Sequence, residues 1–478
     1  MENDSLKNAM KKGLFWKFGE KVFVQGTQLL LQIILARLLF PDDFGVLAIL
    51  NVFIALSDVF ILYSFTTALI QKKNADQLDF SSVFFFNIGI SILLYLILFF
   101  CAPLVSKFYK IESLTVLLRV LALNIIIGSF SSIQNAIVSK SLRFKITFIK
   151  SIALVITYAV VSIVLAVNGF GVWSLVLGKV ASTVVGTGIL IILVKWVPTK
   201  EFSFHRMKSL FSFSSKILGT NLLGTVFQNM SSLVIGKYYT TEDLGYYNKG
   251  QQLPQAAMSA IDGSLSEVLY PSMSIIQSDE KALKQLLGRA LCLVYFIIAP
   301  IMIGGIVIAP RLIPALLTEK WVQSVPFFQL QCVVCMFWPM NSETHMLNAK
   351  GLSKLTFILS LTSNIISLLF ILIGVRYSIY VIMIGAILGN LVAVSLSSVF
   401  AYKHVSYSII DLAKDIGPSF VSALLMGACV YFISRVPLSD HYVLVLQIIS
   451  GAVIYFVMSM VIHNKGLIYL KKYFTRKK

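Results

Sequence analysis

The chain of 478 residues is 57% hydrophobic and only 13% charged, which is too apolar for a soluble protein of this length. The net charge is +19, but the lysines and arginines lie between apolar segments rather than in one patch, so nucleic-acid binding is not favoured. Apolar segments of about 20 residues recur from end to end, which is the length needed to cross a bilayer as a helix. The sequence therefore predicts an all-α integral membrane protein.

Fourteen candidate spans follow one another along the chain. Membrane strands are not favoured, because the strands of a barrel alternate polar and apolar residues and these segments are continuously apolar. The spans are 14–39, 44–69, 81–103, 114–138, 147–167, 170–194, 210–234, 252–276, 286–309, 327–348, 355–374, 378–401, 416–434 and 442–462.

Lysines and arginines in the connections indicate how the chain is oriented. With alternating spans, 26 of them fall on the side of the N-terminus and 8 on the opposite side. Because cytoplasmic loops carry the excess of Lys and Arg, both termini are expected in the cytoplasm, which requires an even number of spans.

A repeat divides the predicted bundle into two parallel halves. Segment 35–45 recurs as segment 235–245, an offset of 200 residues without a gap, and Asp43 and Gly45 are identical in the second copy. Six spans separate the two copies, so both lie on the outer side and the halves share one orientation.

Each half also carries a polar stripe on its first span. The stripes step by four, three and four residues, which places each on one face of a helix. They are Lys21, Gln25, Gln28 and Gln32 in the first half, and Asn221, Thr225, Gln228 and Ser232 in the second. We expect the two stripes to face each other across a cavity between two lobes.

The repeat predicts the domain organisation. Residues 1–205 form an N-terminal lobe of six spans, and residues 206–405 form a C-terminal lobe of six more. Residues 406–478 add two spans without counterparts and a basic cytoplasmic tail.

Charged residues deep within the spans are candidates for function, because each costs about 2.5–3.5 kcal/mol at the helix centre on insertion scales. The acidic ones are Asp58 in the second span and Asp262 and Glu267 in the eighth. We expect them to bind a coupling proton or sodium ion, to release a cation from the substrate, or to form an internal ion pair.

The basic residues and polar stripes outline a predicted substrate cavity for an anionic head group. Its expected residues are Lys21, Gln25, Gln28, Arg37, Arg119, Lys179, Asn221 and Gln228. A simpler interpretation stays open. Lys179 would then pair with Asp58 and hold the first lobe together, and the stripes would form hydrogen bonds between helices.

Signatures of an enzyme, a metal site or a cofactor are not found in the sequence. There is no GxxxxGK[ST] segment for ATP, and the five histidines do not have metal-ligand spacing. Cys332 and Cys335 form a CxxC inside an apolar segment, so we expect buried thiols. Glu343 and His345 are expected at a wetted end of the tenth span. Transport would be driven by a proton or sodium gradient, or by the substrate's own gradient.

Several passages resemble one family of transporters. Segment 36–45, Ala-Arg-Leu-Leu-Phe-Pro-Asp-Asp-Phe-Gly, resembles the first outer turn of Wzx-type polysaccharide-repeat flippases. These belong to the multidrug/oligosaccharidyl-lipid/polysaccharide exporter superfamily. Further similar passages are 142–145, 243–249, 319–321 and 348–351.

The resemblance implies a substrate, a partner set and a location. The substrate would be an oligosaccharide repeat unit on undecaprenyl pyrophosphate, moved by alternating access to the outer leaflet of a bacterial inner membrane. The family's basic central cavity would be represented by Lys21 and Lys179. Membrane lipids and glycan polymerase machinery are the other expected partners, and spans 13 and 14 would form a lipid groove, as in a related flippase.

Two other functions are weighed against the flippase. An ion-coupled multidrug antiporter of the same fold would favour an acidic cavity, which Asp58, Asp262 and Glu267 could supply. A membrane-embedded glycan polymerase would need a large outer loop with catalytic arginines, and no connection in this sequence is long enough.

Overall fold

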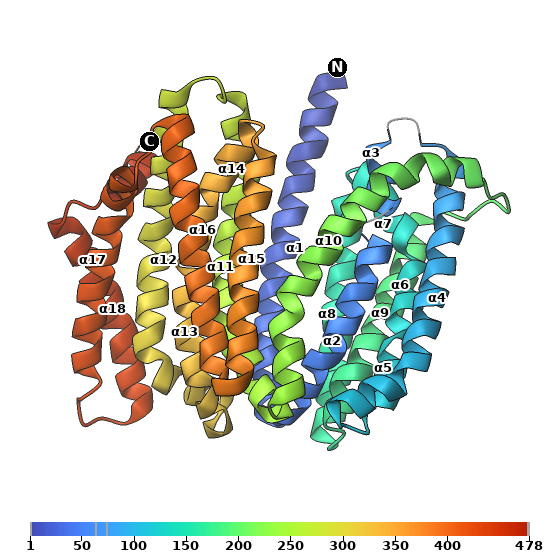
Figure 1. Cartoon of the computed structure of the whole chain (residues 1–478), viewed down its shortest axis with the longest axis horizontal. Coiled ribbons are helices and arrows are strands. Elements are labelled where there is room, and N and C mark those ends of the chain that lie inside the picture. The colour runs from blue at the N-terminus through green and yellow to red at the C-terminus, as the bar shows by residue number, and fades with distance from the viewer. Residues whose placement is uncertain (1, 63–64, 73–74, 476–478) are drawn as a thin grey trace. The chain divides into compact units, whose positions relative to one another are not determined.

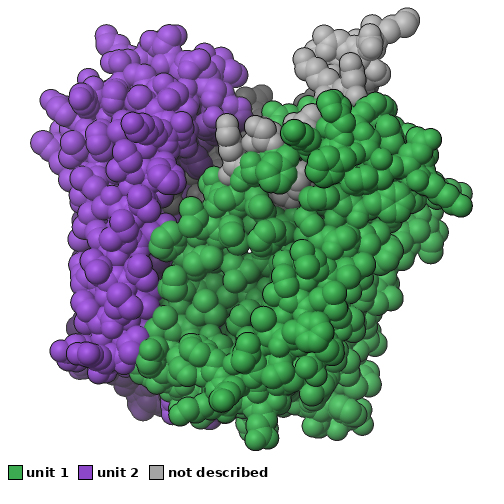
Figure 2. All heavy atoms as spheres, turned by 45° about the vertical axis from the view of Figure 1, so that its right-hand side comes forward, with its two compact units in different colours: residues 1–245 green, residues 246–478 purple. Residues whose placement is uncertain are grey.

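The computed structural model describes residues 2–62, 65–72 and 75–475, which divide into two compact units, residues 1–245 and 246–478 (Figure 1, Figure 2). Within these residues the chain forms helices and no strand, which confirms the all-α class. The side chains of Asp262 and Glu267 lie outside the described part of the structure.

The first unit contains ten helices and the start of an eleventh. They are α1 (Glu2–Leu38), α2 (Pro41–Leu62), α3 (Phe65–Gln71), α4 (Gln77–Tyr109), α5 (Leu114–Leu121), α6 (Leu123–Ser129), α7 (Ser132–Lys140), α8 (Phe144–Val167), α9 (Val172–Val194), α10 (Phe204–Tyr238) and the first residues of α11 (Thr241–Ile275).

The second unit holds the rest of α11 and the helices that follow it. They are α12 (Glu280–Leu317), η1 (Glu319–Ser324), α13 (Val325–Cys335), η2 (Trp338–Asn341), α14 (Ser342–Ala349), α15 (Ser353–Tyr377), α16 (Ile379–Val405), α17 (Ile409–Ile433), α18 (Asp440–Val461) and α19 (Lys465–Thr475).

Nine of the described helices are long and apolar enough to cross a membrane, or ten if the bent pair Leu114–Ser129 and Ser132–Lys140 is one span. The other four expected spans fall on α1, α10 and α11 and on the segment from α13 to α14. The first three have 37, 35 and 35 residues, which is longer than one crossing requires, but α1 and α10 carry the polar stripes. The fourth is divided into short helices.

The fourth span of each half is broken, and it ends in the same way in both. In the first unit Leu142 adopts a left-handed conformation, and Arg143 N–H donates to the Val138 carbonyl at 3.1 Å. In the second, Gly351 is left-handed and Leu352 N–H donates to the Leu347 carbonyl at 2.9 Å. This is the Schellman arrangement that satisfies the last carbonyls of a helix. The repeat therefore includes helix ends as well as sequence.

The two copies of the repeated turn, both within residues 1–245, pack against each other reciprocally. In each copy an aspartate caps the next helix: Phe40 N–H donates to Asp43 at 3.0 Å, and Thr240 N–H to Asp243 at 3.2 Å. A Cβ atom on Gly45 would overlap the Thr241 carbonyl, and one on Gly245 would overlap the Pro41 carbonyl. Only glycine lets the two backbones approach this closely.

In the second unit, α17 and α18 pack on α12 through one apolar cluster. Its buried members are Ala299, Ile303, Ala423, Met426, Val430 and Tyr455. The Tyr455 hydroxyl also donates to the Phe296 carbonyl at 2.8 Å. The last two membrane helices are therefore fixed to the core of this unit.

Candidate functional site

A cavity of about 490 Å³ lies inside the first unit. Helices α1, α2, α6, α8 and α9 surround it, together with residues at the start of and within α7. Its polar wall consists of Gln28, Gln32, Asn51, Asp58, Asn124, Ser131, Asn135, Lys150, Tyr158, Lys179, Ser182, Thr183 and Thr187. Apolar residues complete the lining, so the polar groups are held at membrane depth by a hydrophobic shell.

Helical spacing explains why these side chains converge. Gln28 and Gln32 are four residues apart on α1, and Asn51 and Asp58 are seven apart on α2, so each pair occupies one helix face. Lys179 lies on α9, packed against α8 and α2. Close α8–α9 packing depends on Gly178, where a Cβ atom would overlap the Ser162 hydroxyl.

Asp58 and Lys179 line the cavity without being joined to each other. Asp58 is half-buried and Lys179 is exposed to the cavity, and their charges attract each other across it. Within the described residues, neither side chain makes a hydrogen bond or an ion pair. A carboxylate and an ammonium in this position are available to a ligand, because no described side chain saturates them.

A third charged group of the cavity is held in place. The Lys150 ammonium donates to the Asn135 amide oxygen at 3.0 Å and interacts with the Glu20 carboxylate. Glu20 in turn accepts a hydrogen bond of 2.6 Å from the Ser151 hydroxyl. Lys150 therefore contributes a fixed positive charge at the end of the cavity nearest the start of α8.

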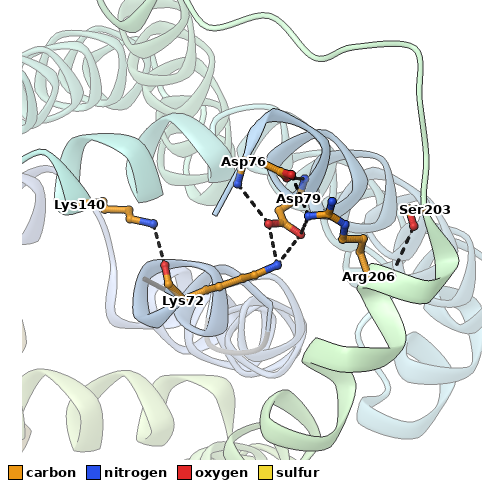
Figure 3. Close-up of polar contacts among 6 residues, drawn as sticks. All are labelled: Lys72, Asp76, Asp79, Lys140, Ser203 and Arg206. Carbon is orange, nitrogen blue, oxygen red and sulfur yellow. Dashed lines mark hydrogen bonds and ion pairs between the residues drawn. The ribbon is translucent and has the colours of Figure 1, made fainter. Parts of the chain in front are cut away.

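Charges at one end of the same unit are instead bound to each other (Figure 3). The buried Asp79 carboxylate contacts the Lys72 ammonium at 2.7 Å and the Arg206 guanidinium at 3.1 Å. Arg206 also contacts Asp76 at 2.8 Å, and Lys140 donates to the Lys72 carbonyl at 2.8 Å. The backbone N–H of Asp79 and the Arg206 guanidinium hold the pKa of Asp76 below its usual value. This network joins the starts of α4 and α10 through paired charges.

The cavity contains three of the predicted site residues: Gln28, Asp58 and Lys179. Lys21 and Gln25 are half-buried elsewhere on α1, and Arg37 is exposed at its end. Arg119 is engaged locally, with its Nε donating to the Phe99 carbonyl at 3.2 Å and its guanidinium 4.1 Å from the centre of the Phe99 ring.

The predicted residues of the second stripe do not line this cavity. Asn221 is half-buried and Gln228 is exposed on α10. A cavity shared by two lobes stays a prediction, as do the ion-coupling roles of Asp262 and Glu267. Among the residues searched, no group of three His, Cys, Asp or Glu side chains could hold a metal ion.

Sequence reasoning missed several polar residues of the cavity, above all Asn124, Asn135 and Lys150. Lys150 is one of the 26 lysines and arginines counted above on the side of the N-terminus, and it lies one turn inside the predicted span 147–167. Asn135 lies 15 residues before Lys150, and the sequence alone does not predict that it faces the cavity. The direction of its side chain depends on the break between α6 and α7, which the sequence pattern does not show.

The fold is that of known membrane transporters. The structure resembles the lipid II flippase MurJ with a TM-score of 0.73 and 16% identity, covering 95% of this chain and 99% of that one. It also resembles an inward-facing multidrug resistance MATE transporter with a TM-score of 0.65 and 14% identity, covering 80% and 94%. These similarities place the chain in a class of multi-pass transporter folds.

The sequence specifies the family within that class. Residues 34–326 match the family described as "Polysaccharide biosynthesis protein", and the chain belongs to it. A membrane protein encoded in the cps region of Klebsiella pneumoniae is 24% identical over 99% of both chains. The lipopolysaccharide biosynthesis protein WzxC of Escherichia coli is 23% identical over 83% of this chain and 81% of its own. The teichuronic acid biosynthesis protein TuaB of Bacillus subtilis is 27% identical over 61% of each.

Proposed function

We propose that this protein flips a lipid-linked oligosaccharide repeat unit from the cytoplasmic to the outer leaflet of a bacterial inner membrane, with undecaprenyl pyrophosphate as the carrier. The family and the names of WzxC and TuaB support a role in polysaccharide export. The fold shared with a lipid II flippase supports a lipid-linked substrate. The observation that carries the proposal is Lys179, which lines a polar cavity and has no ion-pair partner among the residues that the structure describes.

The cavity would receive only part of such a substrate. A volume of about 490 Å³ is in the range of small-ligand sites, roughly 300–1,000 Å³. It can hold a phosphate group or one or two sugars, while the lipid tail stays in the bilayer. Lys179 and Lys150 would attract the phosphate charge, and the amides of Gln28, Asn51 and Asn124 would form hydrogen bonds with sugar hydroxyls.

Asp58 gives the cavity a means of release. When the carboxylate is ionised it competes with the phosphate for the Lys179 ammonium, because both are anions facing the same cation. When it binds a proton or sodium ion, this competition is weakened and the substrate is held more firmly. Alternation between these two states of Asp58 would couple transport to an ion gradient. In this proposal both termini of the chain lie in the cytoplasm.

The test is replacement of the free lysine. Lys179→Ala should lower surface glycan at least tenfold relative to the wild-type protein when each is expressed in a flippase-deficient strain. The matched control is Lys208→Ala, which removes an exposed lysine of α10 and should leave export unchanged. Normal export by Lys179→Ala, at an equal amount of protein in the membrane, would contradict the proposal.

A multidrug antiporter is the second candidate, favoured by one observation. The carboxylate of Asp58 faces the cavity and could bind a cationic drug. Vesicles that contain the purified protein separate the two functions: exchange of a cationic drug for protons, without any lipid-linked sugar, would support the antiporter.

A further inference from the structure

Glu343 is a buried carboxyl group of the second unit that the proposed function leaves unused. It lies in the first turn of α14, and its exposed fraction is 0%. The helix is anchored beside it by Met346 and Leu347, which are fully buried in the apolar core of this unit. The expectation of a wetted helix end is therefore wrong at Glu343, because the side chain points into the protein and not towards water.

Two serines of α16 bind this carboxyl group. The Ser397 hydroxyl is hydrogen-bonded to Oε2, and the Ser398 hydroxyl lies 3.0 Å from Oε1 and 3.2 Å from Oε2. No lysine, arginine or histidine among the described residues forms an ion pair with Glu343. A buried ionised carboxylate with neutral partners alone is costly, so the neutral acid is favoured.

The number of available protons leads to the same conclusion. Ser397 Oγ also lies 3.0 Å from the Val394 carbonyl, so this hydroxyl has two neighbours that can only accept if Glu343 is ionised. A serine hydroxyl has one proton and can donate to one of them. If Glu343 is protonated, Oε2–H donates to Ser397 Oγ, and Ser397 donates to Val394. Every contact is then satisfied.

The titratable groups around the site do not supply a positive charge to it. From α12, the neutral phenol of Tyr295 faces the carboxyl and donates to the Met336 carbonyl at 2.5 Å. From the segment after α16, Tyr407 also faces it, and burial and Asp415 raise the pKa of that phenol, so it stays neutral. The basic side chains on these helices are His345 on α14 with Lys350 directly after it, Lys281, Lys284, Arg289 and Arg311 on α12, Lys354 and Arg376 on α15, and Lys403 and His404 on α16. The other acidic or titratable side chains are Glu280 and Cys292 on α12, Tyr377 on α15, and Tyr380 and Tyr402 on α16, and none of these supplies a positive charge.

Three of these basic groups, Lys350, Lys284 and His345, are engaged elsewhere. The Lys350 ammonium contacts Glu280 at 2.9 Å, and the Lys284 ammonium contacts Asp411 at 2.8 Å. His345 contacts the ring of Tyr270, with centroids 6.3 Å apart. None of them competes with the two serines for Glu343.

We propose that Glu343, Ser397 and Ser398 form a binding site for one proton, which the folded protein holds at neutral pH. The site joins α14 to α16, so a separation of these helices would admit water and let the Oε2–H proton leave, with the carboxylate then solvated. This last step rests on the proposed transport function, whereas occupancy of the site by a proton does not.

Infrared difference spectra between the purified full-length wild type and its variants test whether Glu343 holds a proton. The wild type should show the carbonyl stretch of a neutral carboxylic acid at neutral pH, and Glu343→Gln should abolish it. Ser398→Ala should shift this band to higher frequency, because the hydrogen bond to Oε1 is lost. The matched control is Glu280→Gln, which removes an exposed carboxylate and should leave the band unchanged.

Several results would overturn the proposal. One is a spectrum in which wild type and Glu343→Gln have the same neutral-acid band, and another is the loss of only an ionised-carboxylate band. Failure of Glu343→Gln to fold would also contradict it, because glutamine offers an N–H donor and a carbonyl acceptor in place of the O–H donor and carbonyl acceptor of the protonated acid. The spectra do not involve transport, so their outcome is independent of the glycan export assay.

Discussion

At the scale of single residues, the first unit uses its charged groups in two different ways. Asp79 is buried and bound to Lys72 and Arg206, whereas Asp58 and Lys179 face a cavity without a bonded partner. The sequence predicted that the last two lie at depth, since depth follows from the position within an apolar segment. It could not predict which charges are paired, because pairing depends on contacts between helices far apart in sequence.

The Asp58 carboxylate should be needed to couple transport to an ion gradient. Asp58→Asn removes the charge but keeps the shape, so we expect substrate transport into vesicles to lose its response to an imposed pH or sodium gradient. The stimulated rate should fall about tenfold, or about 1.4 kcal/mol. Asp440→Asn is the control, since this exposed residue pairs only with Arg311 among the described ion pairs. An unchanged response to both gradients would make Asp58 a structural residue.

The Asp79 carboxylate, which is bound to Lys72 and Arg206, should contribute to the free energy of unfolding. Asp79→Ala leaves Lys72 and Arg206 facing each other at the end of the unit, and breaking a buried pair costs about 3–5 kcal/mol. The side chains of Lys72 and Arg206 are 31% and 34% exposed, so water screens part of this cost and we expect a value near 3 kcal/mol. Thermal unfolding in detergent measures it, and a loss below about 0.5 kcal/mol would show that the network is not stabilising.

At the scale of elements, the apolar pattern predicted spans but not the breaks within them. The span 114–138 is divided into α5, α6 and α7, where the Ser129, Ser131 and Ser132 hydroxyls donate to carbonyls three residues earlier. Such bonds compete with the helical ladder. In the span 327–348, Pro339 lacks an N–H and lies in η2, between α13 and α14. The mean hydropathy of these segments stays high despite the breaks, so a prediction from hydropathy does not detect them.

The repeated turn was predicted from sequence, but its packing was not. The glycine at the end of each copy could have been a simple turn residue. The structure shows that it provides space for the backbone of the other copy. The spacing of residues within segment 35–45 does not predict that segment 235–245 packs against it.

A pair of glycine substitutions tests this packing. Gly45→Ala places a methyl group on the Thr241 carbonyl and should destabilise the protein by about 1–3 kcal/mol. Gly26→Ala is the control, because nothing lies within 4 Å of its added Cβ, and it should be neutral or stabilise α1 by up to about 1 kcal/mol. Unfolding temperatures in detergent report both. Equal effects of the two substitutions would refute the close approach.

At the scale of the whole molecule, composition and periodicity predicted the class and the polar face of α1, and short passages such as 36–45 carried the resemblance to a family. They did not predict that Gln28 and Gln32 of this face would line a cavity inside the first unit, together with α2, α8 and α9, whereas Lys21 and Gln25 would not. A polar stripe determines which side of a helix avoids lipid. It does not determine which helix lies opposite, because that depends on how the bundle is assembled.

The orientation of the whole chain can be measured directly. We expect a reporter that is active only in the cytoplasm to work when fused after Lys478 or inserted in the connection 195–203. Insertion in the connection 110–113 should abolish its activity. Six predicted spans precede the connection 195–203, which returns the chain to the side of the N-terminus, whereas three precede the connection 110–113, which leaves it on the opposite side. Activity at both connections would exclude the predicted alternation.

The packing of Gly45 on the Thr241 carbonyl and of Gly245 on the Pro41 carbonyl restricts how the chain can have changed over time. If the two halves descend from one duplicated gene, most of their residues have since diverged. The turns could not do so independently, because a side chain acquired by one copy would meet the main chain of the other. Mutual steric constraint is thus a physical reason why an ancestral likeness persists at this point of the sequence.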